Sequence, residues 1–156
     1  MNEKIAYLID LLIIPLIIFA YYQSLKLTAI LNLNVIYFFF ILFMLIHVLS
    51  SILSLLSNYF IYGEFNRSMI LTGFGPTFMA FSTLLLVNLL PFLKWPFYLF
   101  KWIPYFDSWI TPFLMGLSAF ITQVLIRKTI SETINDVDLQ IENIKKNTKE
   151  IISPPI

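Results

Sequence analysis

Hydrophobic residues are concentrated in four long stretches of the chain, which predict four membrane-spanning helices. The clearest stretch runs from Val35 to Leu56 and contains no charged residue in 22 positions. As an α-helix with a rise of about 1.5 Å per residue it is about 33 Å long, which matches the hydrocarbon core of a bilayer. The sequence therefore predicts an all-α integral membrane protein whose spans cover about residues 5–23, 35–57, 76–92 and 109–126.

The last part of the chain shows a different periodicity. Apolar residues, with one threonine among them, recur at alternating intervals of four and three, and the positions between them are mostly polar. This heptad spacing predicts an amphipathic helix with one apolar face, here called the tail seam. The tail seam consists of Ile130, Ile134, Val137, Ile141, Ile144, Thr148 and Ile151.

β-Branched residues at both heptad positions of the tail seam favour association of three or four helices over two. The sequence therefore predicts a homo-trimer or homo-tetramer held by a cytoplasmic coiled coil. The alternative is an amphipathic helix on the membrane or on its own bundle, but the four acids between 132 and 142 would be repelled by anionic lipid. The expected domains are a four-helix transmembrane domain over 1–128, a coiled-coil-like helix over 129–152 and a disordered end over 153–156.

Composition agrees with a membrane protein and argues against several classes of function. Of 156 residues, 59% are hydrophobic and 12% are charged, whereas soluble domains carry about 25% charged residues. A net charge of +1 provides no basic surface for nucleic acid, so nucleic acid is not an expected partner. The chain has one histidine and no cysteine, and no nucleophile and base share a recognisable motif. We expect neither an enzyme nor a bound metal or cofactor.

A row of polar side chains lies on one face of the second predicted span. Its members follow each other at steps of 4, 3 and 4 residues, and polar groups at this depth face another helix or a wet cavity. Two interpretations stay open. The row either holds helices together through hydrogen bonds to neighbours such as Thr83, or lines an ion path together with Gln123, in which protonation would change conduction. This row, the polar stripe, consists of His47, Ser51, Ser54 and Asn58.

Further polar candidates within the predicted spans are Asp10, Asn88 and Gln123. Asp10 is the only acid there. Either the helix N-terminus and a partner such as Arg67 stabilise it, or it binds a proton or a cation. Asn88 and Gln123 are candidates for interhelical hydrogen bonds or for a polar path. In the same first span, Pro15 removes a backbone hydrogen bond and predicts a kink.

Aromatic and basic residues gather between the third and fourth predicted spans. A Lys-Trp pair recurs seven residues after its first occurrence, and another tryptophan begins the fourth span. Tryptophan with lysine is typical of the headgroup level of a bilayer. We expect a structural interfacial band, with a recognition surface for lipid or a partner as the alternative. This interface belt consists of Lys94, Trp95, Lys101, Trp102 and Trp109.

Gly73-Phe74-Gly75, just before the third predicted span, resembles the end of the selectivity filter of potassium channels. The match is restricted to these three residues. Leu71 and Thr72 stand where the filter has threonine and valine, and Pro76 stands where it usually has an acid. We therefore expect the two glycines to turn the chain and Pro76 to begin the next helix at its first position.

Basic residues near the ends of the predicted spans favour a cytoplasmic location for both termini. Four of them, at Lys4, Arg67, Arg127 and Lys128, fall on one side of the membrane, and three fall on the other. By architecture alone, four spans followed by a helical tail from Arg127 to Ile152 is similar to the Kiwa membrane proteins of bacterial phage-defence systems, and also to small flippase-like proteins. The first resemblance implies a bacterial inner membrane and a part in antiviral defence.

Two functions follow as expectations. The first is a homo-oligomeric membrane scaffold or sensor whose cytoplasmic tail organises the subunits and docks a cytosolic protein. The second is an oligomeric ion channel or small transporter whose path is lined by the polar stripe.

Overall fold

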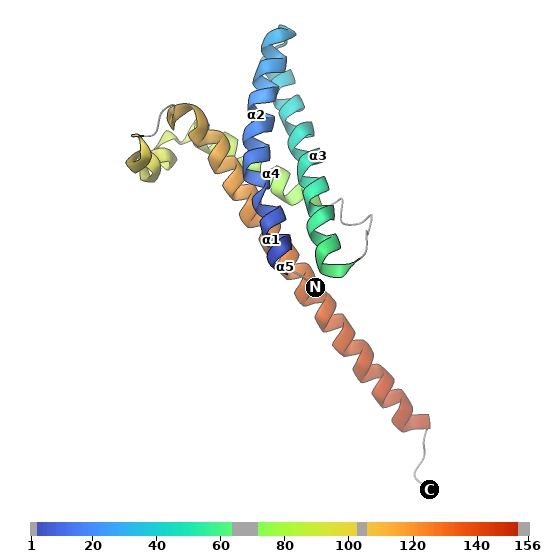
Figure 1. Ribbon diagram of the computed structural model, residues 1–156. Coiled ribbons are helices and arrows are strands. Elements are labelled where there is room, and N and C mark those ends of the chain that lie inside the picture. Colours follow the sequence, from blue (N-terminus) through green and yellow to red (C-terminus); the bar gives the residue numbers. More distant parts are fainter. Residues whose placement is uncertain (1–2, 64–71, 103–105, 153–156) are drawn as a thin grey trace. The chain divides into compact units, whose positions relative to one another are not determined.

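The computed structural model describes residues 3–63, 72–102 and 106–152, and within these ranges every regular element is a helix (Figure 1). The predicted all-α class is therefore confirmed. The chain divides into two compact units, a bundle over Met1–Val124 and a tail over Leu125–Ile156. The elements are α1 (Glu3–Leu11), α2 (Ile13–Ile30), α3 (Val35–Tyr62), α4 (Phe74–Leu89), the 3₁₀-helix η2 (Pro91–Phe100) and α5 (Phe106–Ile152).

The first apolar stretch is interrupted at Leu12, between α1 and α2. Pro15 has no amide hydrogen, so the carbonyl of Leu11 loses its usual helical donor. The amide of Leu12 donates to the carbonyl of Ile9 at 3.1 Å, which is a tighter turn than an α-helix makes. The interruption predicted from Pro15 is thus present one turn before the proline. Beyond it, α2 continues to Ile30, past the expected end of the span.

Helix α3 follows α2 after a short turn over residues 31–34, and the two helices pack side by side in opposite directions (Figure 1). The side chain of Asn34 caps α3 by accepting a hydrogen bond from the amide of Ile36 at 2.7 Å. Gly63 ends the helix with φ of 73°, a left-handed conformation that glycine adopts without steric cost. Both ends of α3 therefore have a local cause in the sequence.

Three helical stretches among the described residues are long and apolar enough to cross a membrane, namely Lys4–Ile30, Val35–Ile61 and Asp107–Ile130. They support the predicted membrane protein. The fourth expected span corresponds to α4, which has only 16 residues. A helix of that length is about 24 Å long and falls short of a hydrocarbon core of about 30 Å. Three full-length apolar helices and one shorter one thus replace the four similar spans that we expected.

The first part of α5 runs antiparallel to α1 and α2. The hydroxyl of Tyr22 donates to the carbonyl of Ser108 at 3.2 Å, and the amide of Gln123 donates to Asp10 at 2.8 Å. Residue numbers therefore fall along α1–α2 as they rise along α5. Because α3 is also antiparallel to α2, α3 and α5 run in the same direction.

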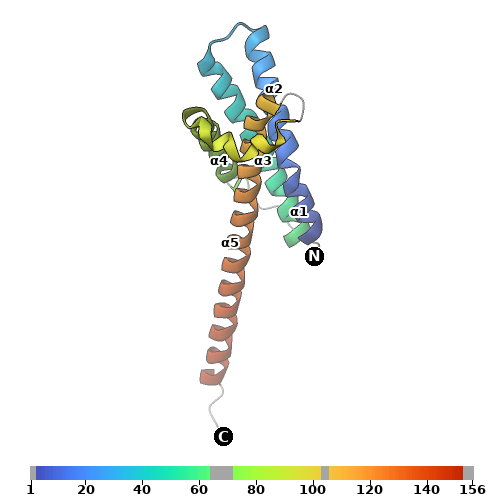
Figure 2. The same cartoon turned by 90° about the vertical axis from the view of Figure 1, so that its left-hand side faces the viewer.

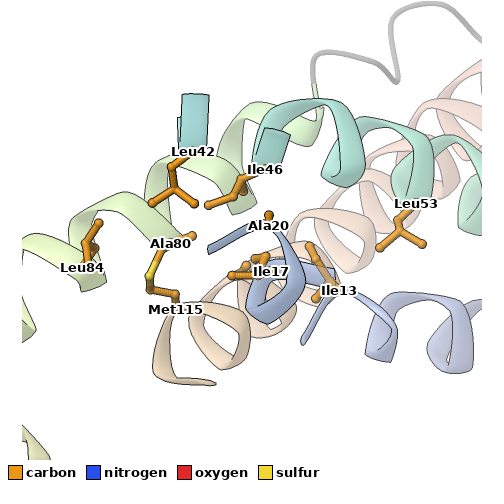
Figure 3. Packing of buried hydrophobic residues seen from close by; sticks show 10 residues of the cluster. Ile13, Ile17, Ala20, Leu42, Ile46, Leu53, Ala80, Leu84 and Met115 are labelled. Atoms are coloured by element: carbon orange, nitrogen blue, oxygen red, sulfur yellow. The ribbon is translucent and has the colours of Figure 1, made fainter. Parts of the chain in front are cut away.

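The core of the bundle is apolar and receives side chains from α2, α3, α4 and α5 (Figure 3). Gly116 brings α5 against the interrupted first stretch, because a Cβ atom at this position would lie only 2.9 Å from the Cα of Ile14. The buried core residues are Ile13, Ile17, Ala20, Leu42, Ile46, Leu53, Ala80, Leu84, Met115 and Ala119.

In the tail, α5 continues as one uninterrupted helix to Ile152 (Figure 2). The tail-seam residues Val137, Ile141 and Ile144 are 44–65% exposed. The side chains of Ile134, Thr148 and Ile151, and the whole of 153–156, lie outside the described residues. The assembly of three or four tails stays a prediction.

Candidate functional site

The polar stripe of α3 contacts the start of α4. A Cβ atom on Gly73 would lie 2.8 Å from the Cα of Ser51, so the chain passes directly against the backbone of α3. The hydroxyls of Ser54 and Thr72 are hydrogen-bonded to each other. The amide of Asn58 donates weakly to the hydroxyl of Ser54 at 3.5 Å. These contacts put three members of the stripe around one point, where α4 begins.

His47, the fourth member, is held by aromatic rings. Its ring stacks on Phe43, with 6.3 Å between the ring centroids, and lies 4.1 Å from the ring of Phe74, the first residue of α4. Its Nδ1 atom is buried without a hydrogen-bond partner. Thr83, which we expected as a partner, donates instead to the hydroxyl of Ser118 at 2.8 Å. The imidazole therefore acts here as a flat packing surface.

Helix α4 begins beside the middle of the long apolar helix α3. Ser51, which touches Gly73, is close to the middle of the apolar stretch Val35–Ile61. Thr77 is fully buried and donates its hydroxyl to the carbonyl of Gly73 at 2.8 Å. The N-terminal end of α4, which carries a partial positive charge, is thus placed among hydroxyl groups within the bundle.

The geometry of Gly73-Phe74-Gly75 differs from that of a potassium filter. Gly73 has φ of −66° and ψ of −18°, a right-handed helical conformation, and α4 includes both Phe74 and Gly75. A filter needs carbonyls that line a pore, whereas helical carbonyls point along their own helix. Pro76 is the third residue of α4 rather than the first that we expected. It still falls in the first turn, where a missing amide hydrogen is tolerated.

A second polar contact joins α1 to α5. Asp10 is fully buried, and its Oδ1 atom accepts a hydrogen bond from the Nε2 atom of Gln123 at 2.8 Å. The Oε1 atom of Gln123 is buried without a partner. Arg67, the expected partner of Asp10, lies outside the described residues. Gln123 thus pairs with α1, whereas the polar stripe meets α4, and the two polar groups form separate contacts.

The remaining candidate residues have local roles. Asn88 is exposed and donates to the carbonyl of Leu84 in its own helix at 2.8 Å. Trp109 packs edge-on against Phe113, with 5.6 Å between their ring centroids, beside the small apolar cluster of α4 and α5. Among the described residues, no three His, Asp or Glu side chains come together as a metal site would require.

The contacts that the sequence reasoning missed are those of Thr72, Gly73 and Thr77. Thr72 and Gly73 were considered only for their resemblance to a filter, and Thr77 was not distinguished from the other residues of the predicted third span. The signal that could have found them is the pairing of glycine with a serine-rich helix, because these residues let backbones approach closely in membranes.

Comparison of the chain with models of protein families, with curated proteins and with solved structures finds no match. The resemblances to the Kiwa membrane proteins and to flippase-like proteins stay predictions from architecture. Function is therefore argued from geometry.

Proposed function

We propose that this protein is a membrane-embedded scaffold that assembles into a homo-trimer or homo-tetramer through its tail and presents that tail to a cytosolic protein. The observation that carries the proposal is the exposure of Val137, Ile141 and Ile144 on a helix that begins as an apolar span. A bacterial inner membrane and a part in phage defence belong to the proposal through the architectural resemblance alone.

Val137 and Ile141 of the tail seam remain exposed in the single chain and would be stabilised by burial against another surface. Full burial of one such side chain is worth about 1.5–3 kcal/mol. Anionic lipid is a poor partner for this face, because acidic residues alternate with the tail seam and the side chains of the ion pair Lys128–Glu132, at 3.9 Å, are both exposed. Other copies of this helix fit best, since a heptad repeat winds around an equal partner and copies in one membrane present parallel seams.

Four crossings of the bilayer complete the proposed arrangement. Since α3 and α5 run in the same direction, the chain between Gly63 and Phe106 returns from one end of the bundle to the other. Helix α4 runs opposite to α3, because it begins beside Ser51 and its Phe81 lies 5.3 Å, ring to ring, from Phe43. Helix α4 would then supply the described part of the return crossing. Both termini would lie on one side, which the basic residues favour as the cytoplasm.

The test of the scaffold is the mass of the protein in mild detergent, measured by native mass spectrometry. Val137→Asp, or separately Ile141→Asp, should convert the oligomer to monomer, because the seam would bury one unpaired charge from each chain. Leu139→Asp is the matched control, since Leu139 is exposed two residues away and off the seam. A monomeric native protein, or equal dissociation of all three variants, would overturn the proposal.

The topology has its own test, because the chain contains no cysteine. Single cysteines at Asn32, in the turn between α2 and α3, and at the exposed Lys145 can be labelled from outside with an impermeant maleimide. We expect Asn32→Cys to be labelled in intact cells, and Lys4→Cys and Lys145→Cys only after lysis. Labelling of Lys4→Cys and Lys145→Cys from opposite sides would exclude four crossings.

A second candidate function is ion conduction, which is favoured because α4 begins inside the bundle beside Ser51. Broken crossings whose helix ends meet polar groups at mid-depth are typical of transporter sites. The contact of Gly73 with Ser51 leaves no room for a ligand at that point, so a path would require α4 to move. Purified protein in liposomes loaded with proton or potassium indicators distinguishes the candidates. Flux above that of empty liposomes supports conduction, and silence supports the scaffold.

A further inference from the structure

Helix η2 exposes an unusually large apolar surface for a ten-residue element. In a 3₁₀-helix, residues three apart align along the axis, so Phe92 and Trp95 share one ridge and Leu99 lies on another, while Trp102 follows in the turn after η2. These four side chains are 67–82% exposed, more than most of the apolar residues of the bundle. Lys94 is half-buried, on the third ridge. The chain therefore leaves two of the three ridges uncovered at these positions.

The neighbours of η2 place it at one end of the bundle. Just before it, Val87 of α4 packs with Ile110 and Leu114 near the start of α5. Ser108 also receives the hydrogen bond from Tyr22, towards the end of α2 that turns into α3. Tyr22 lies eight residues before the end of α2, and α5 begins at Phe106, so η2 directly precedes the start of an apolar helix, where the surface of a bilayer is expected.

The charges of this segment have one sign. Between residues 72 and 106 the only charged side chains are Lys94 and Lys101. The Nζ atom of Lys101 lies 5.5 Å from the ring centroid of Tyr98, a cation–π contact that keeps the ammonium group beside the aromatic surface. With about 2 Å of rise per residue, the two lysines are about 14 Å apart along the axis, too far to share one phosphate.

We propose that η2 is a lipid-binding element that lies in the headgroup layer at this end of the bundle, with Lys94 and Lys101 each binding the phosphate of an anionic phospholipid. The exposed tryptophans enter the boundary between headgroups and acyl chains, where their amphipathic rings are most favourable. The two lysines remain level with the phosphates because their alkyl chains extend along apolar surface. Anionic lipid is the partner that fits best, because the exposed apolar surface of η2 carries Lys94 and Lys101 and no acidic side chain.

Lipid retention tests the lysines. Native protein in vesicles of phosphatidylcholine with about a third phosphatidylglycerol should be enriched in phosphatidylglycerol when released into the mass spectrometer. Lys94→Gln and Lys101→Gln should each weaken this preference about fivefold, the value of one basic residue at an anionic surface. Lys26→Gln is the matched control, because Lys26 is exposed on α2 towards the same end of the bundle. Equal retention in all variants, or an equal loss in the control, would overturn the proposal.

Tryptophan depth tests the placement separately. The variant Trp95→Phe/Trp109→Phe keeps Trp102 as the sole tryptophan of the chain. Lipids brominated near the headgroup should quench its fluorescence more strongly than lipids brominated near the acyl end, and soluble acrylamide should quench weakly. Strong quenching by acrylamide without quenching by brominated lipid would instead indicate a water-facing surface for a protein partner and would exclude the lipid site.

Discussion

Val48 in the bundle and Leu139 in the tail have nearly the same exposure, 50% and 59%, in surroundings of opposite character. Val48 lies near the middle of the apolar stretch Val35–Ile61, where the neighbouring exposed residues are also apolar. Leu139 lies among aspartates, glutamates and lysines on a helix that has left the apolar span. Lipid covers the first kind of side chain, whereas water or another protein helix meets the second.

The comparison shows that exposure alone does not identify a partner surface in a membrane protein. The location of buried polar side chains helps to distinguish a lipid-facing surface from a surface that faces water or protein. In the bundle, Asp10, Ser54 and Gln123 are buried while large apolar side chains face outward, which is the arrangement expected in lipid. In the tail, the density of charged residues argues against lipid as the partner of the apolar seam and supports the proposed protein contact.

The largest expected effect comes from placing one charge at each of these positions. Val48→Asp should reduce membrane integration by about 3 kcal/mol, the cost of an aspartate at the centre of a membrane helix. Leu139→Asp should change integration by less than about 0.5 kcal/mol, as exposed substitutions usually do. The measurement is the fraction that resists alkaline extraction from membranes. Normal integration of Val48→Asp would mean that this face of α3 contacts water or protein.

Helix packing within the bundle gives the next effect. Gly116→Leu should destabilise the bundle by about 2–3 kcal/mol, because even a Cβ atom would lie 2.9 Å from the Cα of Ile14, part of the backbone. Unfolding in a titration with sodium dodecyl sulfate measures the change. Ala29→Leu introduces the same side chain at an exposed position of α2 and should have almost no effect. If the oligomer is held by the tail, Gly116→Leu should leave its mass unchanged before unfolding.

The polar contact between α1 and α5 gives a smaller effect. Gln123→Leu removes the hydrogen bond to the buried carboxylate of Asp10 and should cost about 2 kcal/mol. Asn88→Leu is the control, because Asn88 is exposed and its side chain donates a hydrogen bond to the carbonyl of Leu84 within the same helix. Equal stabilities of the two variants in the same titration would show that the contact contributes nothing to the bundle.

Local sequence patterns were sufficient for the helices themselves. The apolar stretches, Pro15 and the heptad spacing identified the broken first helix, α3 and two helical segments over 109–126 and 129–152, which the structure joins into the single helix α5. The ends were less accurate. Helix α2 runs past Gln23 to Ile30, because no glycine or proline stops it there. Pro91 closes the predicted third span early, so that α4 ends at Leu89.

Tertiary contacts were predicted only in part. Asp10 and Gln123 were both identified as candidates, yet nothing local to either one indicates a partner 113 residues away. The contact between Gly73 and Ser51 depends on where α4 returns against α3, which no periodicity encodes. His47 was identified from its depth, but its neighbour is Phe74 rather than Thr83. Residue type predicts that a buried polar group needs a neighbour, and the fold decides which one.

The smallest expected effect concerns His47, where packing and conduction predict different results. His47→Phe keeps a ring between Phe43 and Phe74 and removes the buried Nδ1 atom that lacks a partner, so we expect a change of less than about 0.5 kcal/mol. His47→Ala removes the ring and should cost about 1 kcal/mol, the value of one aromatic contact. In liposomes at about pH 5.5 and about pH 7.5, both variants should match the native protein. A pH-dependent flux that is present in the native protein and lost in the well-folded His47→Phe would instead assign the imidazole to a conducting path, and it would make the polar stripe the functional centre in place of the tail.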